Sequence, residues 1–283
     1  MRIYVVDYAV ENFLKSAKLS QTIPSNACSA GINPWSVAGI AVLGDEMFVV
    51  CWGQPNIQVY KYNTDDVNVQ RYINIDAASN TFRGLAACEF NQCLYASELN
   101  AGCIHKVSPV TNNTVQRWSV NGQPCGVTVN RAHNLLVACC NTHKVQEYTT
   151  DGSMVREISL QPDITNPTHV VQLRNDQFGI TQQGSVYRYC VVGSDGKIVK
   201  STGSGQMGQP YGFAVSKGGS KIFVADQGSN RILLLESKSL SVQQLAAAFN
   251  VGFNQPSCIH LDESAGVIYV GEWSGDRIMC FKK

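Results

Sequence analysis

Short apolar runs with an alternating pattern recur along the chain, and turns rich in Gly, Asn, Asp and Ser separate them. In residues 209–236 the runs "GFAV", "KIFVAD" and "RILLLE" are of strand length and rich in β-branched and aromatic residues. Runs of this kind, bounded by turn residues, are typical of antiparallel β-strands. A fourth, more polar run such as "SVQQLAA" follows in most copies of the pattern. The pattern predicts four short strands in a unit of about forty residues.

Six copies of this unit run through the sequence. They begin near Ser36, Phe82, Gln123, Asn166, Gln209 and Gln255. The positions equivalent to Gly212 are Gly39, Gly84, Gly126, His169 and Cys258, at successive spacings of 45, 42, 43, 43 and 46 residues. A period in the forties with four strands per repeat is typical of propeller blades. The sequence therefore predicts an all-β fold, a six-bladed β-propeller of four-stranded antiparallel blades, as a single domain over residues 1–283.

The two ends of the sequence predict how the ring closes. The last copy stops at "RIMCFKK", after its third strand, whereas "FLKSAKLS" from Phe13 resembles the fourth run of other copies. We therefore expect the N-terminal segment to supply the outer strand of the last blade. The segment "RIYVVDY", residues 2–8, resembles a third strand but has no place in this scheme.

The later copies resemble NHL repeats. "QPYGFAV…KIFVADQGSNRILLL" and "QPSCIHL…VIYVGEWSGDRIMCF" are similar to the NHL pattern of Pro-x-Gly, an apolar strand, "IYVAD", a turn with Asn, and Arg-Ile. The similarity is specific in residues 209–281, fair in 123–148, and weak but in register in 36–107 and 166–189. This resemblance implies a propeller similar to the C-terminal domain of tripartite-motif NHL proteins, with a role in recognition.

An acid and an arginine five residues apart recur in the two clearest copies. Asp226 with Arg231, and Glu272 with Arg277, would face each other across the hairpin between the second and third strands. We expect these pairs to be ion pairs at the blade edge, with a structural role.

Composition and charge bear on partners and location. The chain has 22 basic and 21 acidic residues and a net charge of +1, so no strong field attracts DNA or a membrane surface. No export signal is visible. The eleven cysteines follow neither a disulfide framework nor zinc spacing, and the adjacent Cys139 and Cys140 are badly placed to pair with each other. We expect reduced thiols and a monomeric cytoplasmic protein, with no membrane or DNA partner.

Strand direction predicts which face of the propeller binds a ligand. The loops that lead into the inner strands share one face, here called the rim face, with the loops between the second and third strands. The ligand-binding candidates on it are Trp52, Arg83, His143, Lys144, Tyr211 and Trp273. Aromatic rings and Arg beside Asn and Gln suit a peptide or a few nucleotides. Alternatively, Trp52 and Trp273 only pack between blades.

No motif in the sequence builds a catalytic centre. The inner strands "GIAV", "GLAA", "GVTV", "HVVQ", "GFAV" and "CIHL" contain no carboxylate, and there is no G-x-S-x-G, phosphate loop or HExxH. His169 and His260 are expected to face the central channel, where one histidine is more often a packing residue than a catalyst. We therefore expect no catalytic residue, no cofactor and no metal.

Two hypotheses of different classes remain. The first is a recognition module without catalysis that binds a protein or peptide, or alternatively single-stranded RNA, on the rim face. Four rim bases, Arg83, Lys144, Arg231 and Arg277, are balanced by Glu98, Asp226, Glu272 and Asp276. This balance leaves little positive charge for phosphates and favours a peptide. The second is an enzyme of the strictosidine-synthase or lactonase type, using His169, His260 or acids such as Glu98 and Glu272.

Overall fold

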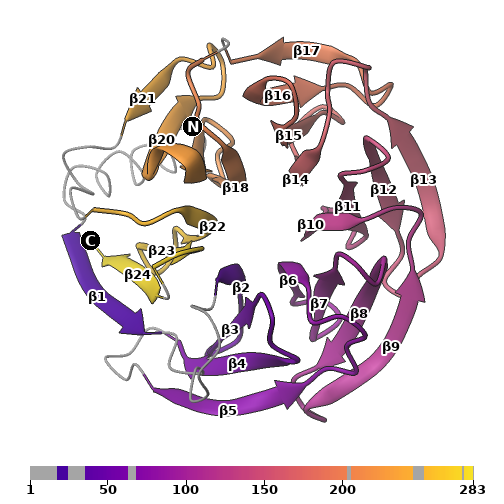
Figure 1. Ribbon diagram of the computed structural model, residues 1–283, viewed down its shortest axis with the longest axis vertical. Coiled ribbons are helices and arrows are strands. Elements are labelled where there is room, and N and C mark those ends of the chain that lie inside the picture. The colour runs from indigo at the N-terminus through magenta and orange to yellow at the C-terminus, as the bar shows by residue number, and fades with distance from the viewer. Residues whose placement is uncertain are drawn as a thin grey trace.

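The six repeats form six four-stranded antiparallel sheets arranged in a ring (Figure 1). The computed structural model describes residues 18–24, 36–62, 68–202, 205–244, 252–275 and 277–282. Within these ranges the helical content is one 3₁₀ turn, η1 (Gln227–Ser229). The predicted six-bladed propeller is confirmed. Residues 2–8, which had no assigned place, lie outside the described ranges.

Each of the first five blades uses four consecutive strands, from the inner strand to the outer strand. Blade 1 has β2 (Val37–Leu43), β3 (Glu46–Cys51), β4 (Asn56–Lys61) and β5 (Val69–Asn74). Blade 2 has β6 (Phe82–Cys88), β7 (Cys93–Glu98), β8 (Cys103–Ser108) and β9 (Asn113–Ser119). Blade 3 has β10 (Pro124–Val129), β11 (Leu135–Cys139), β12 (Lys144–Tyr148) and β13 (Met154–Ser159). Blade 4 has β14 (Pro167–Gln172), β15 (Phe178–Gln183), β16 (Tyr187–Val192) and β17 (Ile198–Ser201). Blade 5 has β18 (Pro210–Val215), β19 (Lys221–Asp226), β20 (Arg231–Glu236) and β21 (Val242–Gln244).

Blade 6 closes the ring with strands from both ends of the described chain. Its strands are β22 (Pro256–Asp262), β23 (Val267–Glu272), β24 (Arg277–Lys282) and, outermost, β1 (Lys18–Pro24). Strand β1 pairs antiparallel with β24, from Lys18 opposite Lys282 to Pro24 opposite Arg277. The Ser257 hydroxyl also donates a hydrogen bond to the carbonyl of Val37 in blade 1. The predicted closure by the N-terminal segment is confirmed.

The core lies between neighbouring blades. The second strands β7, β19 and β23 are buried at every residue, whereas the outer strand β9 alternates between exposed and half-buried positions. One cluster joins Phe48 and Val50 of blade 1 to Phe82 and Leu94 of blade 2. This arrangement explains why the inner runs are continuously apolar and the fourth run is polar.

The repeat glycine permits close contact between adjacent inner strands. A Cβ at Gly39 would lie 2.7 Å from the Leu85 nitrogen of the next blade, and one at Gly84 would lie 2.9 Å from the Val127 nitrogen. A Cβ at Gly212 would likewise lie 2.7 Å from the Ser257 carbonyl oxygen. The glycine of the Pro-x-Gly pattern is therefore required for inter-blade packing around the channel.

The expected acid–arginine pairs are present. Arg231 Nε donates to Asp226 at 2.9 Å, and Arg277 Nε donates to Glu272 at 2.7 Å. Asp226 also accepts the backbone N–H groups of Gly208 and Gln209, in the loop that leads into β18. The pair therefore fixes that loop to the hairpin, as the structural interpretation predicted.

Two findings bear on location and redox state. Within the described ranges, no helix has the length and apolar character needed to cross a membrane. The ten cysteines among the described residues are all free thiols, and nine of them are buried.

Candidate functional site

Four of the predicted rim residues converge on one point. The Arg83 guanidinium carbon lies 4.4 Å from the ring centroid of Trp52, 4.4 Å from that of Trp273 and 5.6 Å from that of Tyr211. The two indole centroids are 5.8 Å apart. We call Trp52, Arg83, Tyr211 and Trp273 the Arg83 cluster. Its members come from blades 1, 2, 5 and 6.

The repeat places the two tryptophans alike. Trp52 and Trp273 each follow the last residue of a second strand, and their backbone N–H groups donate to the carbonyls of Ser36 and Gln255. Both side chains are half-buried, and Trp273 also packs against the blade 1–blade 2 core. The tryptophans therefore pack between blades and also contact the guanidinium, and their role in ligand binding stays a prediction.

Arg83 and Tyr211 occupy a second repeat position, directly before the repeat glycine. The residues at this position are Ala38, Arg83, Cys125, Thr168, Tyr211 and Ser257. Because one comes from each inner strand, they form a ring at the mouth of the channel. Tyr211 is 6% exposed, and its hydroxyl has no hydrogen-bond partner among the described residues.

Two cavities meet at Arg83. The first, the channel, has a volume of about 290 Å³ and is lined by the inner strands of all six blades. The second, the rim cavity, has a volume of about 360 Å³. It is lined by Arg83, Leu99, Cys125, Cys140, Asn166, Thr168, Gln183, Tyr211, Gln227 and Trp273. Eight of these ten residues stand directly before a repeat glycine position or directly after a second strand. The repeat therefore builds the rim cavity.

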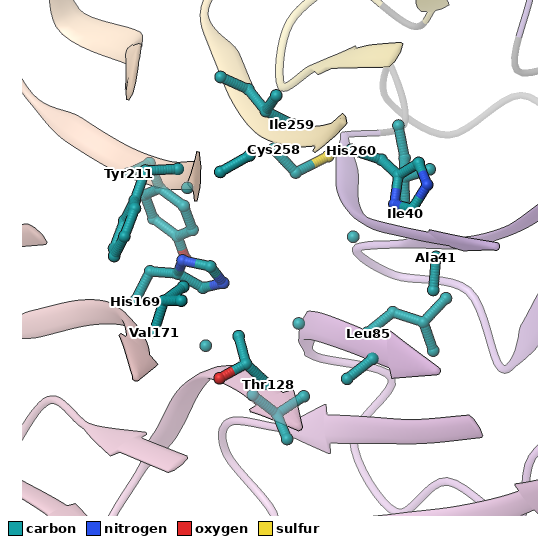
Figure 2. A pocket seen from close by; sticks show the side chains of 18 of the residues that line it. Ile40, Ala41, Leu85, Thr128, His169, Val171, Tyr211, Cys258, Ile259 and His260 are labelled. Atoms are coloured by element: carbon teal, nitrogen blue, oxygen red, sulfur yellow. The ribbon is translucent and has the colours of Figure 1, made fainter. Parts of the chain in front are cut away.

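The channel carries both predicted histidines. Figure 2 shows His169 of β14 beside Tyr211 and His260 of β22 on the side of Ile40. Burial lowers the pKa of each imidazole to about 4, so both are neutral at physiological pH. His169 packs edge-on against Phe213 at a centroid distance of 5.0 Å, and its Nδ1 has no partner among the described residues. With no carboxylate in the channel lining, the histidines have no partner for acid–base chemistry there.

The other two predicted binding residues lie apart from this cluster. His143 accepts the backbone N–H of Asn166 at its Nδ1, with 3.1 Å between the two nitrogens. Lys144 forms an ion pair with Glu157 of β13. Neither side chain lines the channel or the rim cavity. The structure therefore brings together Trp52, Arg83, Tyr211 and Trp273, but not His143 or Lys144.

Three of the four predicted rim acids are not available to a ligand, and the fourth, Asp276, lies outside the described residues. The side chains of Glu98, Asp226 and Glu272 are fully buried, and none lines either cavity. Arg231 and Arg277 are paired to Asp226 and Glu272. Arg83 remains as the base of this set that faces a cavity.

The third carboxylate, Glu98, lies in a buried group with two other possible metal ligands. Its Oε2 is 2.9 Å from His105 Nε2 and 3.6 Å from Cys103 Sγ, and no other described set of three ligands is as close. Glu98 also accepts the backbone N–H groups of residues 78–80 and the Ser79 hydroxyl. Burial would raise the pKa of Glu98, but the hydrogen bonds from His105 and Ser79 lower it to about 2. The oxygens of Glu98 already accept these hydrogen bonds. In blade 2, Glu98, Cys103 and His105 therefore take the structural place of the acid–arginine pairs of blades 5 and 6.

Two thiols of the rim cavity lie close together. Hydrogen bonds from the Cys125 thiol and from the backbone N–H groups of Asn141 and Cys140, together with the charge of Arg83, lower the pKa of Cys140 to about 7, although burial opposes this shift. The hydrogen bond between the two thiols and burial raise the pKa of Cys125. Sequence reasoning compared Cys140 only with its neighbour Cys139 and missed this pair. The alignment of the repeats could have predicted this pair. Cys125 occupies the same repeat position as Arg83, and Cys140 the same position as Trp52, and both positions face the rim.

Comparisons with known proteins show the fold. No family model matches the chain, and neither does any of the curated proteins searched. Among solved structures, virginiamycin B lyase from Staphylococcus aureus has 12% identity and a TM-score of 0.65, over 95% of this chain and 100% of that chain. Hydrazine synthase from Kuenenia stuttgartiensis has 12% identity and a TM-score of 0.65, over 91% and 98%. The WD40 β-propeller domain of Doa1 has 11% identity and a TM-score of 0.63, over 95% and 97%. At such identities the similarity extends to the propeller architecture alone.

Proposed function

We propose that this propeller is a non-catalytic recognition module of NHL type that binds a protein or peptide on its rim face. The observation that carries the proposal is the Arg83 cluster, in which two indoles and a guanidinium meet beside a cavity. Aromatic residues and arginine dominate the binding energy of protein interfaces. The cluster is also preorganised, because the blades hold all four side chains before a ligand arrives.

Single-stranded RNA is the less favoured ligand. Lys144, Arg231 and Arg277 are each paired with a carboxylate, which leaves a single arginine facing the cavity. Binding to a phosphate backbone depends on several basic contacts and weakens steeply with salt. One arginine flanked by aromatic rings supports recognition of a small number of groups on a peptide.

An enzyme is the second candidate, because one structural neighbour is a lyase. Its support here is the pair of channel histidines. The carboxylates that this hypothesis invoked, Glu98 and Glu272, are fully buried and outside both cavities. The channel therefore contains no acid–base pair, and recognition is the better-supported function.

Selection from a displayed library of nine-residue peptides tests the proposal. We expect the wild-type protein to enrich peptides that the variant Trp52→Ser/Trp273→Ser no longer binds, with an affinity loss of about tenfold or more. The control Phe90→Ser removes a 73%-exposed ring from the loop between β6 and β7, and should bind as wild type. Salt-sensitive micromolar binding of random single-stranded RNA, with no peptide enriched, would contradict the proposal.

A further inference from the structure

Among the described residues that line the two cavities, Arg83 is the one charged side chain. The channel is lined by apolar residues, threonines, a serine, a cysteine, a tyrosine and two neutral histidines, and the rim cavity by apolar, amide, hydroxyl and thiol groups. Among the described residues no carboxylate forms an ion pair with Arg83. A half-buried guanidinium in such a place has lost water without gaining an anion.

The other arginines of the described chain show how unusual this is. Five half-buried arginines each form an ion pair with a carboxylate: Arg71, Arg156, Arg188, Arg231 and Arg277. Arg117, Arg131 and Arg174, which form none among the described residues, are exposed to solvent. Arg83 alone combines partial burial with the lack of a carboxylate within this part of the chain.

The surroundings of Arg83 hold the cation in place without neutralising it. The faces of Trp52 and Trp273 stabilise the guanidinium through cation–π contacts, each at 4.4 Å. A cation–π contact does not use up the five N–H donors of a guanidinium, so they can also donate to an acceptor. Those N–H groups are suited to a planar anion that accepts two parallel hydrogen bonds.

We propose that the rim cavity binds a carboxylate of an acidic peptide, held by the guanidinium of Arg83 between the two indoles. This inference rests on the proposed function and names the chemistry of its ligand. The amide side chains of Asn166, Gln183 and Gln227 line the same cavity and offer donors and acceptors to a peptide backbone.

Charge favours a carboxylate over a phosphate. A carboxylate carries one negative charge, which one arginine balances, whereas a phosphoryl group carries close to two and is usually bound by several bases. The other sequence-predicted rim bases, Lys144, Arg231 and Arg277, are already paired. The cavity therefore matches a monoanion.

The test uses the peptides that the wild-type library selection yields. Each selected peptide is resynthesised with its acidic residue as Glu, Gln or phosphoserine, with a free or an amidated C-terminus, and its affinity is measured by fluorescence polarisation. We expect the Glu form to bind about tenfold or more tightly than the Gln form, and Arg83→Gln to abolish that difference. The amidated series shows whether the carboxylate belongs to a side chain or to the chain end.

Three controls make the outcomes distinct. Arg131→Gln removes an exposed arginine and should leave the preference for the Glu peptide unchanged. Arg83→Lys keeps the positive charge but loses the two parallel N–H donors of the guanidinium, so it should retain part of that preference. Thermal unfolding of each variant shows whether the fold is intact.

Peptides that require Trp52 and Trp273 but bind equally well in their Glu and Gln forms would overturn the carboxylate inference alone. Tighter binding of the phosphoserine form would overturn it in favour of phosphate. Failure to enrich any tryptophan-dependent peptide would overturn the proposed function as well.

Discussion

At the scale of single residues, Cys140 is the group whose chemistry departs most from its neighbours. Its pKa is lowered to about 7, while burial raises the pKa of Cys139 and of Cys258 to about 12. The thiolate is the nucleophile, so Cys140 should react with iodoacetamide well before the other described cysteines. Its rate should fall about tenfold between pH 8 and pH 6, since the thiolate fraction falls by that factor around a pKa of 7. Site-resolved mass spectrometry measures both.

Variants test two of the causes of the lowered pKa. Cys125→Ala removes the thiol hydrogen bond, and Arg83→Gln removes the nearby positive charge; each should shift the rate profile of Cys140 to higher pH. Cys93, whose pKa burial raises, serves as the internal reference. Uniform labelling of all cysteines at one rate would show that Cys140 is not a distinct thiol.

The sequence could locate single residues only where they follow the repeat. Arg83, Tyr211 and Trp273 occupy repeat positions that line the rim cavity, and Trp52 occupies the same repeat position as Trp273, so the register alone places the four together. Lys144 lies beyond those positions, at the start of a third strand, and its partner Glu157 comes from the outer strand. Side-chain pairing of this kind depends on the conformation of long side chains, which periodicity does not encode.

At the scale of the strand pair, a buried acid connects the hairpin of blades 2, 5 and 6 to the loop before the inner strand. Asp226 is fully buried and accepts Arg231 Nε at 2.9 Å, Gly208 N at 2.7 Å and Gln209 N at 2.9 Å. Asp226→Asn removes the negative charge of the group that accepts these three hydrogen bonds. We expect the substitution to lower the free energy of unfolding by about 2–4 kcal/mol. Urea denaturation at neutral pH measures this loss.

An exposed acid provides the comparison. Asp195 lies in the turn between β16 and β17, and its carboxylate is 60% exposed and 3.7 Å from Lys197. Because an exposed ion pair contributes little, Asp195→Asn should change the free energy of unfolding by no more than about 0.5 kcal/mol. Equal effects of the two substitutions would mean that the buried pair is no more than a surface contact.

The role of the buried acid was only half visible in the sequence. The five-residue spacing predicts the ion pair across a tight hairpin, because both residues belong to one local turn. The backbone N–H groups that the acid also accepts come from a loop about eighteen residues earlier in the chain. Blade 2 shows where the five-residue spacing fails as a predictor. Glu98 keeps the hydrogen bonds to the loop, but its side-chain partner is His105, which lies two residues after the position of the arginine in the other blades.

At the scale of the whole molecule, periodicity predicted the ring because every blade has the same neighbours. Five successive spacings in a narrow range require six equivalent units, and a missing fourth strand at one end requires a strand from the other end. The non-periodic segments gave no such constraint, and residues 2–8 could not be placed for that reason. The ligand is likewise not encoded by the repeat, because it depends on the one blade position where Arg83 replaces a neutral residue.

Closure of the ring by β1 should determine the stability of the complete propeller. Ile23 is 4% exposed and packs in one cluster with Val37 of blade 1 and Ile278 of blade 6, so it stabilises the joint between the first and last blades. Ile23→Ala should lower the free energy of unfolding by about 2–4 kcal/mol. Thr22→Ala, at the exposed neighbouring position of the same strand, should change it by no more than about 0.5 kcal/mol. In urea denaturation, we expect the midpoint of Ile23→Ala to fall with the slope unchanged, because the ring unfolds as one unit. A reduced slope, or a midpoint equal to that of Thr22→Ala, would show instead that the blades remain folded when the ring opens.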